Sequence, residues 1–439
     1  MKTEKVPLES GIRDLITTLY PICRSITGDG VRETLRIMKN IIPLEIVEIP
    51  TGTKVFDWEV PREWNIRDAY IKDLKGNKIV DFKDSNLHVV NYSIPVDKII
   101  PSSELKNHLH TLPEYPDWIP YRTSYYKETW GFCVQDSRVK SMKDEEYEVK
   151  IDSTLAEGHL TYGELYIPGS IKDEVLFSCH VCHPSLANDN LSGIAVMTYL
   201  ARHLMTLKLH YSYRFLFVPG TIGSIVWLAS NQDKLKNVKH GLIAVNLGDP
   251  GKINFKKTRL GNAEIDRAVE AILRDSGQPY GLIDFFPYGY DERQYNSPGI
   301  NLPVGCIMRT PHNQFPEYHT SADNLDFIRA ESLMDSYHKI LNIVDLLESN
   351  RTYFNTQPYC EPQLGKRGLY RHIGGSNATV DQMALLWVLN LADGFHSLLD
   401  IAERSGESYE SLKKAADLLL QHDLLEVRDG ESRSKGIQV

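Results

Sequence analysis

The sequence predicts an α/β fold built on a mostly parallel sheet with helices on both faces. The main observation is that strand-like and helix-like segments alternate through the middle of the chain. The strand-like segments span 174–179, 213–218, 241–247 and 302–308, and the helix-like segments span 191–206, 222–231, 262–275 and 331–348. This alternation is typical of parallel strands joined through helices that cover the sheet. A second observation is that polar clusters follow several of the strands, where open α/β sheets bind their ligands.

The size and composition of the chain exclude several classes of protein. Its 439 residues suffice for two or three domains. The formal net charge of −9 is unfavourable for a general nucleic-acid binder. No apolar run reaches the roughly 18 residues of a membrane span, and the first residues lack the apolar core of a signal peptide. Because six cysteines without an export signal fit a reducing compartment, we expect a cytoplasmic protein without a disulfide framework.

The amino-terminal third of the chain changes character twice. Residues 9–43 are expected to be helical, with a break at Thr27-Gly28-Asp29-Gly30. From about Pro50 to Pro116, apolar residues alternate and Lys75-Gly76-Asn77 suits a hairpin turn, which indicates a β-rich insertion. The main domain is expected to resume with a strand near Glu148-Val149-Lys150-Ile151. We therefore predict a discontinuous main domain, residues 1–49 and 117–355, that is interrupted by an inserted domain, residues 50–116.

The last part of the chain, residues 356–439, predicts a separate winged helix-turn-helix domain. Helices are expected over Gln382–Leu391, Ser397–Arg404 and Tyr409–His422, with a turn at Asp393-Gly394. A strand and wing tip would follow over Leu424–Gly430. Between Asn377 and Asp429 there are ten acidic and four basic residues, whereas DNA affinity depends on neutralising phosphates. The charge pattern therefore disfavours DNA as a partner, and it favours a protein contact or a homo-oligomer through the winged helix.

Potential metal ligands are concentrated in the segment Cys179-His180-Val181-Cys182-His183-Pro184-Ser185, directly after a strand. Asp189 follows in an Asn-Asp-Asn-Leu-Ser-Gly turn, and Glu317-Tyr318-His319-Thr320 supplies another histidine after a later strand. Imidazole and carboxylate groups with one open position are the ligands of catalytic zinc. The combination predicts a metal site that contains His180, Asp189 and His319.

These residues resemble the co-catalytic zinc aminopeptidases, which carry in order a histidine, an Asp-Asn-x-Ser-Gly segment, a Glu-Glu pair, an aspartate and a final Tyr-His-Thr. The Cys-His-x-Cys-His-Pro-Ser signature and the winged helix resemble, more narrowly, a group of bacterial aminopeptidase-like proteins associated with polysaccharide-biosynthesis genes. The resemblance implies a zinc-aminopeptidase-like fold in which His180 and His319 each serve a metal and Asp189 bridges two sites or anchors one. Asp249 corresponds to the family's later aspartate, displaced by about one position.

The chain also departs from this family pattern. Where the Glu-Glu pair is expected, the sequence has Gly220-Thr221, so the usual proton acceptor and one ligand are missing. A general base contributes about 10²–10⁴ in rate, and the missing ligand favours one zinc per chain over two. Asp291 or Glu292, in the loop Tyr288–Tyr295, could replace the base. A solvated acidic turn paired with Arg293 is the alternative.

Four residues are candidates for holding substrate: Arg293, Arg309, His312 and Glu317. An arginine fork suits a substrate carboxylate, although a structural ion pair would explain Arg309 equally well. Cys182 could be an additional soft ligand, and His183 is expected to be structural rather than a ligand. The Cys-x-x-Cys-His string does not indicate haem attachment or a redox pair, because no export signal precedes it and no helix opens at it.

Two functions remain compatible with the sequence. The first is a zinc-dependent aminopeptidase-like hydrolase that acts on a small peptide or amide substrate and is linked to polysaccharide biosynthesis. The second is a catalytically attenuated metal-binding scaffold with a winged-helix interaction module. The replacement of the Glu-Glu pair by Gly220-Thr221 is what keeps the second hypothesis open.

Overall fold

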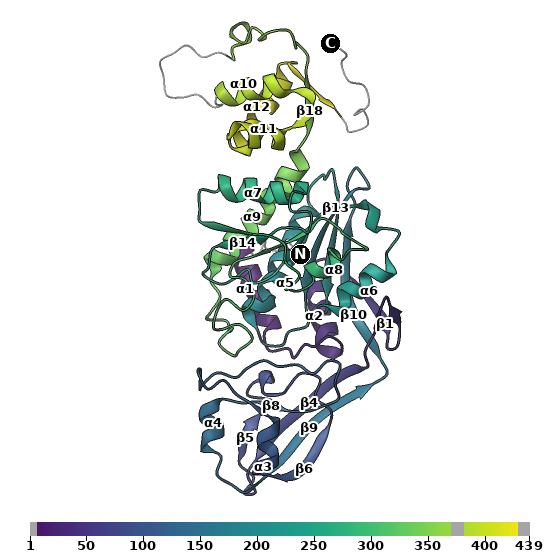
Figure 1. Cartoon of the computed structure of the whole chain (residues 1–439), viewed down its shortest axis with the longest axis vertical. Helices are drawn as coiled ribbons and strands as arrows, with labels where there is room; N and C mark the ends of the chain where they lie inside the picture. The colour runs from purple at the N-terminus through teal and green to yellow at the C-terminus, as the bar shows by residue number, and fades with distance from the viewer. Residues whose placement is uncertain (1–6, 370–381, 429–439) are drawn as a thin grey trace, which may run out of the picture. The chain divides into compact units, whose positions relative to one another are not determined.

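The computed structural model describes residues 7–369 and 382–428 (Figure 1). These residues form two compact units. The first contains the chain up to Ala263 together with Gly281–His338, and the second contains Glu264–Tyr280 together with the residues from Lys339 on.

The first unit is organised around an eight-stranded sheet. Its strands, in spatial order, are β1 (Glu45–Pro50), β10 (His159–Ile167), β12 (Ser212–Val218), β11 (Glu174–His180), β13 (Val238–Ala244), β16 (Val304–Met308), β14 (Ile253–Lys256) and β15 (Tyr280–Ile283). The four middle strands, β12, β11, β13 and β16, are parallel, as predicted. The pairs β1–β10, β10–β12 and β14–β16 are antiparallel, which the sequence did not reveal. His180 is the last residue of β11 and pairs with Val218, so it lies at the carboxyl edge of the parallel strands.

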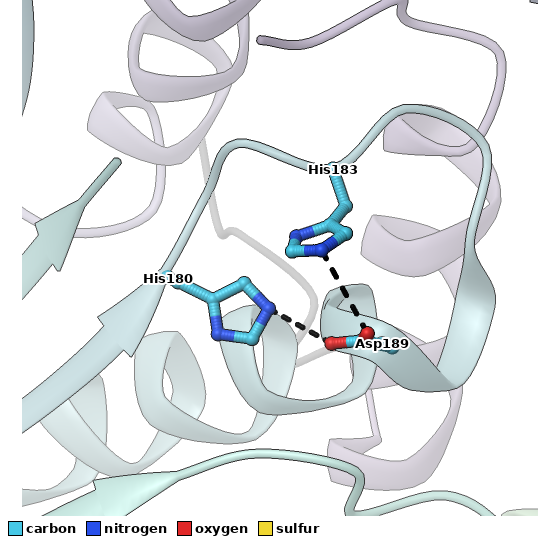
Figure 2. Close-up of side chains that lie close together, drawn as sticks. All are labelled: His180, His183 and Asp189. Carbon is cyan, nitrogen blue, oxygen red and sulfur yellow. Dashed lines mark hydrogen bonds and ion pairs between the residues drawn. The ribbon is translucent and has the colours of Figure 1, made fainter. Parts of the chain in front are cut away.

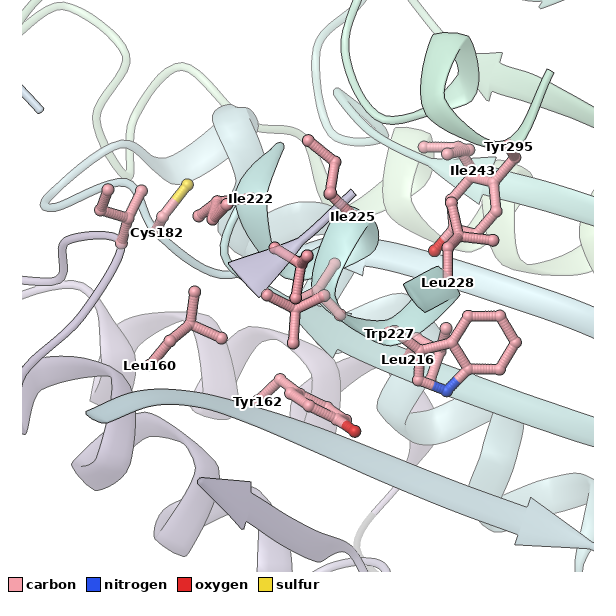
Figure 3. Close-up of a cluster of buried hydrophobic side chains, with 14 of the residues drawn as sticks. Leu160, Tyr162, Cys182, Leu216, Ile222, Ile225, Trp227, Leu228, Ile243 and Tyr295 are labelled. Atoms are coloured by element: carbon pink, nitrogen blue, oxygen red, sulfur yellow. The ribbon is translucent and has the colours of Figure 1, made fainter. Parts of the chain in front are cut away.

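Helices lie on both faces of this sheet, which confirms the predicted fold class. The first unit contains α1 (Leu8–Leu19), α2 (Asp29–Lys39), α5 (Gly193–Leu204), α6 (Ile222–Ser230) and the short α8 (Glu292–Tyr295). On one face, Trp227 of α6 joins the apolar cluster that contains Leu160 and Tyr162 of β10 (Figure 3). The next residue of β10, Gly163, faces the other side, where a Cβ atom would lie 2.8 Å from Leu35 of α2.

The predicted β-rich insertion is a second, four-stranded sheet in the order β5, β4, β9, β6. It contains β4 (Glu63–Lys72), β5 (Lys78–Asp81), β6 (Val96–Pro101) and β9 (Glu146–Ala156). The hairpin turn after Lys72 forms as predicted. The expectation that the main sheet resumes near Glu148–Ile151 was wrong, because β9 pairs with β4 and β6 and the chain returns to the main sheet only at β10. Smaller elements here are β2 (Lys54–Val55), β3 (Trp58–Glu59), β7 (Leu109–His110), β8 (Phe132–Cys133), α3 (Ser102–Leu105) and α4 (Asp136–Ser141).

The second unit contains the winged helix. Its elements are α7 (Glu264–Asp275), the carboxyl-terminal half of α9 (Ala330–Ser349), β17 (Thr352–Asn355), α10 (Gln382–Leu391), β18 (Asp393–Ser397), α11 (Leu398–Ser405), α12 (Tyr409–Gln421) and β19 (Leu425–Arg428). The sheet β18-β17-β19 includes Thr352, four residues before the predicted start of this domain. Asp393-Gly394 opens β18 rather than forming only a turn, and the predicted wing tip beyond Arg428 lies outside the described residues. Within residues 7–369 and 382–428, no helix combines the length and apolar character needed to cross a bilayer.

Candidate metal centre

Three buried side chains with metal-binding atoms converge at the carboxyl end of β11. His180, His183 and Asp189 each place one potential ligand atom within 4.8 Å of the others (Figure 2). The His180 Nε2 atom lies 2.8 Å from Asp189 Oδ1, and His183 Nε2 lies 3.8 Å from Asp189 Oδ2. Two imidazoles and a carboxylate, shielded from solvent, are a ligand set that zinc accepts.

His319 adds a fourth side chain to this group. Its Nε2 atom lies 3.0 Å from Asp189 Oδ2, and its ring centre lies 5.1 Å from that of His183. The Asp189 carboxylate is thus surrounded by three imidazoles. Burial alone would raise its pKa, but the three neighbouring histidines lower the pKa by more than burial raises it. The net pKa therefore lies well below the usual range. A fully buried carboxylate whose described polar side-chain partners are all imidazoles fits a cation-binding position.

Asp323 holds the backbone of the loop that carries Asp189. The Asp323 carboxylate accepts hydrogen bonds from the backbone N–H groups of Asn188, at 2.6 Å, and Asp189, at 2.9 Å. Burial raises the pKa of Asp323 to about 8, while the two N–H donors lower it. These bonds orient the backbone of Asp189 and hence its carboxylate.

Asp249, predicted as a metal ligand, is not part of the cluster. One of its oxygens accepts hydrogen bonds from Gly251 N (2.8 Å) and Thr310 Oγ1 (2.5 Å), and the other from Thr310 N and Asn188 Nδ2, both at 3.1 Å. Because both carboxylate oxygens already have two donors, we replace the ligand assignment by a supporting one. Asp249 holds Asn188, the residue that precedes Asp189.

The region around Gly220, where the family pattern has its general base, is filled by Tyr290. A Cβ atom at position 220 would overlap the Tyr290 ring. The Tyr290 hydroxyl donates to the Gly220 carbonyl (3.1 Å) and lies 3.2 Å from Cys182 Sγ. Burial raises the pKa of the Cys182 thiol to about 12 in the metal-free chain. Among the described residues, the cluster of potential ligand atoms contains His180, His183 and Asp189 and does not include this sulfur.

The two carboxylates proposed as a replacement base have different surroundings. Glu292 forms a buried ion pair with Lys256 (2.9 Å) and accepts a hydrogen bond from Tyr290 N (3.0 Å), so its oxygens are committed and we withdraw it as a catalytic residue. Asp291 is fully buried, and its Oδ1 atom accepts a hydrogen bond from Ser224 at 2.8 Å. Its Oδ2 atom is buried without a hydrogen-bond partner. Burial raises the pKa of Asp291 to about 6, against the opposing effect of His180.

The four candidate substrate residues are placed differently. Arg309 is engaged by Asp335 (2.8 Å) and by the carbonyl of Gly251 (2.7 Å), which makes it structural, and Arg293 is exposed. Glu317 is partly exposed. His312 lies beside Tyr290, with ring centres 6.3 Å apart, and its Nε2 atom is buried without a partner. Among these four, His312 therefore has the most suitable free polar atom.

His183 is the ligand candidate that the sequence interpretation missed. We expected it to be structural because it lies beyond the strand end. The chain turns back at Pro184, however, and brings the His183 ring to 4.6 Å from the His180 ring. The i, i+3 spacing of the two histidines before a proline was the available signal.

The sheet with helices on both faces is an aminopeptidase-like fold, it carries a buried His/Asp cluster, and the comparisons agree on the fold. Residues 13–350 match the family described as "Domain of unknown function (DUF4910)", to which this chain belongs, and residues 351–427 match a winged helix-turn-helix family. A Clostridium acetobutylicum protein, whose name links polysaccharide biosynthesis to an aminopeptidase-like domain, is 55% identical over 95% of this chain and 96% of its own. The six cysteines are unpaired in the structure.

Solved structures show the same relationship. The crystal structure of a peptidase from Clostridium acetobutylicum has a TM-score of 0.92 and 53% identity, and the alignment covers 96% of both chains. The zinc aminopeptidase of Bacillus subtilis has a TM-score of 0.57 at 12% identity and covers 78% of this chain and 96% of its own. This second likeness shows a shared fold, and it confirms the predicted resemblance to zinc aminopeptidases.

Proposed function

We propose that this protein is a zinc-dependent hydrolase that cleaves an amide or peptide bond. The observation that carries the proposal is the convergence of His180, His183 and Asp189 at the carboxyl end of β11, with their ligand atoms within 4.8 Å of one another. His319, 3.0 Å from Asp189, would complete the ligand set or hold the substrate side of the site. One zinc ion per chain is favoured, because no further carboxylate joins this cluster among the described residues.

A zinc ion in this position would polarise the substrate carbonyl and lower the pKa of a bound water towards about 7. The residues of the chain supply the rest. Asp291 is the proposed general base, because its Oδ2 atom is buried without a partner and can accept a proton. The hydrogen bond from Ser224 to Oδ1 fixes the orientation of this carboxylate.

His312 is the proposed contact to the substrate. Burial lowers the pKa of His312, so the imidazole is neutral near pH 7 and its Nε2 atom can donate or accept one hydrogen bond. The rings of Tyr290 and Tyr318 lie beside it, with centres 6.3 and 6.1 Å away. This arrangement favours a substrate with a neutral polar group next to the scissile bond.

The substrate class follows from two supports. The fold belongs to aminopeptidase-like proteins, which suggests a peptide amino terminus. The name of the Clostridium acetobutylicum relative mentions polysaccharide biosynthesis, which suggests an amide on an amino-sugar precursor. We propose a cytoplasmic enzyme for such a small substrate, with the winged helix as a contact to protein rather than to DNA.

The test is a hydrolysis assay with amino-acid anilides and small acyl-amino sugars in the presence of zinc, manganese or cobalt. Turnover that is lost in Asp189→Asn, and not in the exposed control Asp97→Asn, would support the hydrolase. Metal binding without turnover on either substrate class would contradict it.

The second candidate function is a metal-binding scaffold without efficient catalysis. The observation that favours it is the Tyr290 ring, which occupies the space above Gly220 where the family places its base. This alternative predicts that Asp291→Asn changes neither zinc affinity nor any measurable turnover. The hydrolase hypothesis instead predicts that this substitution removes turnover while zinc remains bound.

A further inference from the structure

Arg24, in the segment between α1 and α2, reaches the metal-binding loop from a distant part of the sequence. Its side chain is 1% exposed. Its Nε atom donates to the carbonyl of His183 at 2.7 Å and its Nη2 atom to the carbonyl of Pro184 at 2.8 Å. The third nitrogen, Nη1, donates to the carbonyl of Leu19 at 2.7 Å. The guanidinium thus joins the end of α1 to the loop that carries His183.

The hydrogen-bond partners of Arg24 are unusual for a buried cation. Carbonyl oxygens accept its three short hydrogen bonds, and a weaker contact of 3.5 Å goes to Thr34 Oγ1. Burying a charge without a counter-ion costs free energy, and no ion pair among the described residues explains why this arginine is buried. Its geometric consequence is specific, because a planar fork holds two successive carbonyls of the loop in fixed positions.

The backbone around Arg24 is itself closely constrained. A Cβ atom on Gly30 would overlap the Cys23 carbonyl. Gly28 has a φ of 94°, and a Cβ atom on it would overlap the Trp64 carbonyl. The Arg24 carbonyl accepts a hydrogen bond from Asn91 Nδ2 at 2.9 Å. The Thr27-Gly28-Asp29-Gly30 break therefore does more than separate two helices, since it fixes the residue that supports the loop.

A second connection links the same two segments. Ser185 Oγ donates to the Tyr20 carbonyl at 2.6 Å. The loop 183–185 is thus anchored at three consecutive residues to the segment 19–24. Because the loop carries His183 at its start, these anchors act on the ring that faces Asp189.

We propose that Arg24 is a positioning residue of the metal site, which sets zinc affinity by holding His183 in its ligand orientation. The inference rests on the metal site of the proposed function. It does not require catalysis, so it can be tested by binding alone. It also differs from an electrostatic role, because a nearby cation would by its charge oppose a divalent ion.

The experiment measures zinc affinity by competition with a chromophoric chelator, in the full chain purified without a polyhistidine tag. The variants are Arg24→Met and Arg24→Lys, and the matched control is Arg214→Met. Arg214 is also a buried arginine, but its partners Glu164 and Glu174 lie away from the metal end of the sheet. Hydrogen exchange of residues 181–187 in the metal-free protein is the second readout.

We expect both Arg24 variants to lose at least tenfold in zinc affinity and to exchange faster at 181–187, while Arg214→Met stays within about twofold of the wild type in affinity. Arg24→Lys keeps the charge and the fold but cannot span the two carbonyls. This variant therefore tests the proposal even if Arg24→Met does not fold. Unchanged or higher affinity in Arg24→Lys, or an equal loss in Arg214→Met, would overturn the proposal. Absence of zinc binding in the wild type would instead contradict the proposed function.

Discussion

The ring of Tyr290 occupies the space that any side chain on residue 220 would require. A Cβ atom there would overlap the Cε1 atom of the ring, and the Tyr290 hydroxyl donates to the Gly220 carbonyl at 3.1 Å. The Tyr290 ring can therefore occupy this position only because residue 220 is a glycine. An aromatic side chain from the loop before α8 therefore occupies the space where the resemblance to zinc aminopeptidases led us to expect a glutamate.

The first prediction concerns this pair. Gly220→Ala should lower the free energy of unfolding by about 1–3 kcal/mol, because overpacking displaces the Tyr290 ring. Gly220→Glu should not create or raise turnover, although it introduces the residue that the resemblance to zinc aminopeptidases leads one to expect at this position. The measurements are thermal unfolding and kcat/KM.

Gly299→Ala is the control for this prediction, since a Cβ atom there meets nothing within 4 Å. A Gly220→Glu variant that is stable and more active than the wild type would show that Tyr290 does not exclude a base from this position.

The second prediction separates a ligand from a supporting residue. His183→Gln should lower zinc content and affinity by at least tenfold, because it removes an imidazole from the cluster with His180 and Asp189. Asp249→Asn should mainly lower stability, because its carboxylate is committed to hydrogen bonds with Thr310 and Asn188. The zinc content of the two variants and of the wild type is measured by elemental analysis of protein without a polyhistidine tag. We expect about one zinc per chain in the wild type.

If instead Asp249→Asn loses zinc as strongly as His183→Gln, the supporting role would be contradicted and Asp249 would return to the ligand set. Two zinc ions per chain in the wild type would contradict the single site.

The sequence predicted the sheet and its helices well, because each βα unit has a clear local pattern. The strand 174–179 and the helix 331–348 are reproduced as β11 and α9 within one or two residues. It predicted the site only in part. His180 and Asp189 follow a strand and a recognisable motif, whereas the position of His183 depends on the path of the chain after Pro184 and on Arg24, 159 residues away. Neither the saturation of Asp249 by Thr310 nor the Lys256–Glu292 ion pair has a local signal, because both join segments distant in sequence.

The third prediction is a pH dependence that belongs to Asp291. Burial raises its pKa to about 6 in the folded chain, above the value of about 4 for an exposed aspartate. The stability it contributes is therefore fully present below about pH 4 and is lost as the pH rises through about 6. In metal-free protein, Asp291→Asn should be more stable than the wild type at pH 8, by up to about 3 kcal/mol, and not at pH 4.

The same group should control activity in the opposite direction. A general base acts only when ionised, so kcat/KM should rise with pH through an acidic limb at or below about 6, and bound zinc would move that limb lower. Asp291→Asn should remove the turnover, and the exposed control Asp97→Asn should leave the profile unchanged. An acidic limb that persists in a still active Asp291→Asn would assign the base to another group.

The last prediction concerns the winged helix. In winged helices that read DNA, the amino-terminal residues of the recognition helix contact base edges. Here the recognition-helix candidate is α12, and its first residue, Tyr409, donates its N–H to Asp275 of α7 at 2.8 Å. The Tyr409 hydroxyl donates to the Leu346 carbonyl at 3.2 Å, and Arg267 of α7 pairs with Glu403 of α11 at 2.6 Å. These contacts lie within one compact unit. They place α7 against the amino-terminal end of α12, which is the end that would have to contact base edges in a DNA complex.

We therefore expect no measurable affinity of the full chain for random-sequence duplex DNA at about 50 mM salt, by fluorescence anisotropy up to about 10 µM protein. The acidic excess of this domain acts in the same direction. Arg267→Glu should loosen the contact between α7 and α11 and lower the unfolding temperature of this unit without creating DNA affinity. Binding that is tight at low salt and falls steeply as salt increases would show that α12 leaves α7, and would restore DNA as the partner of this domain.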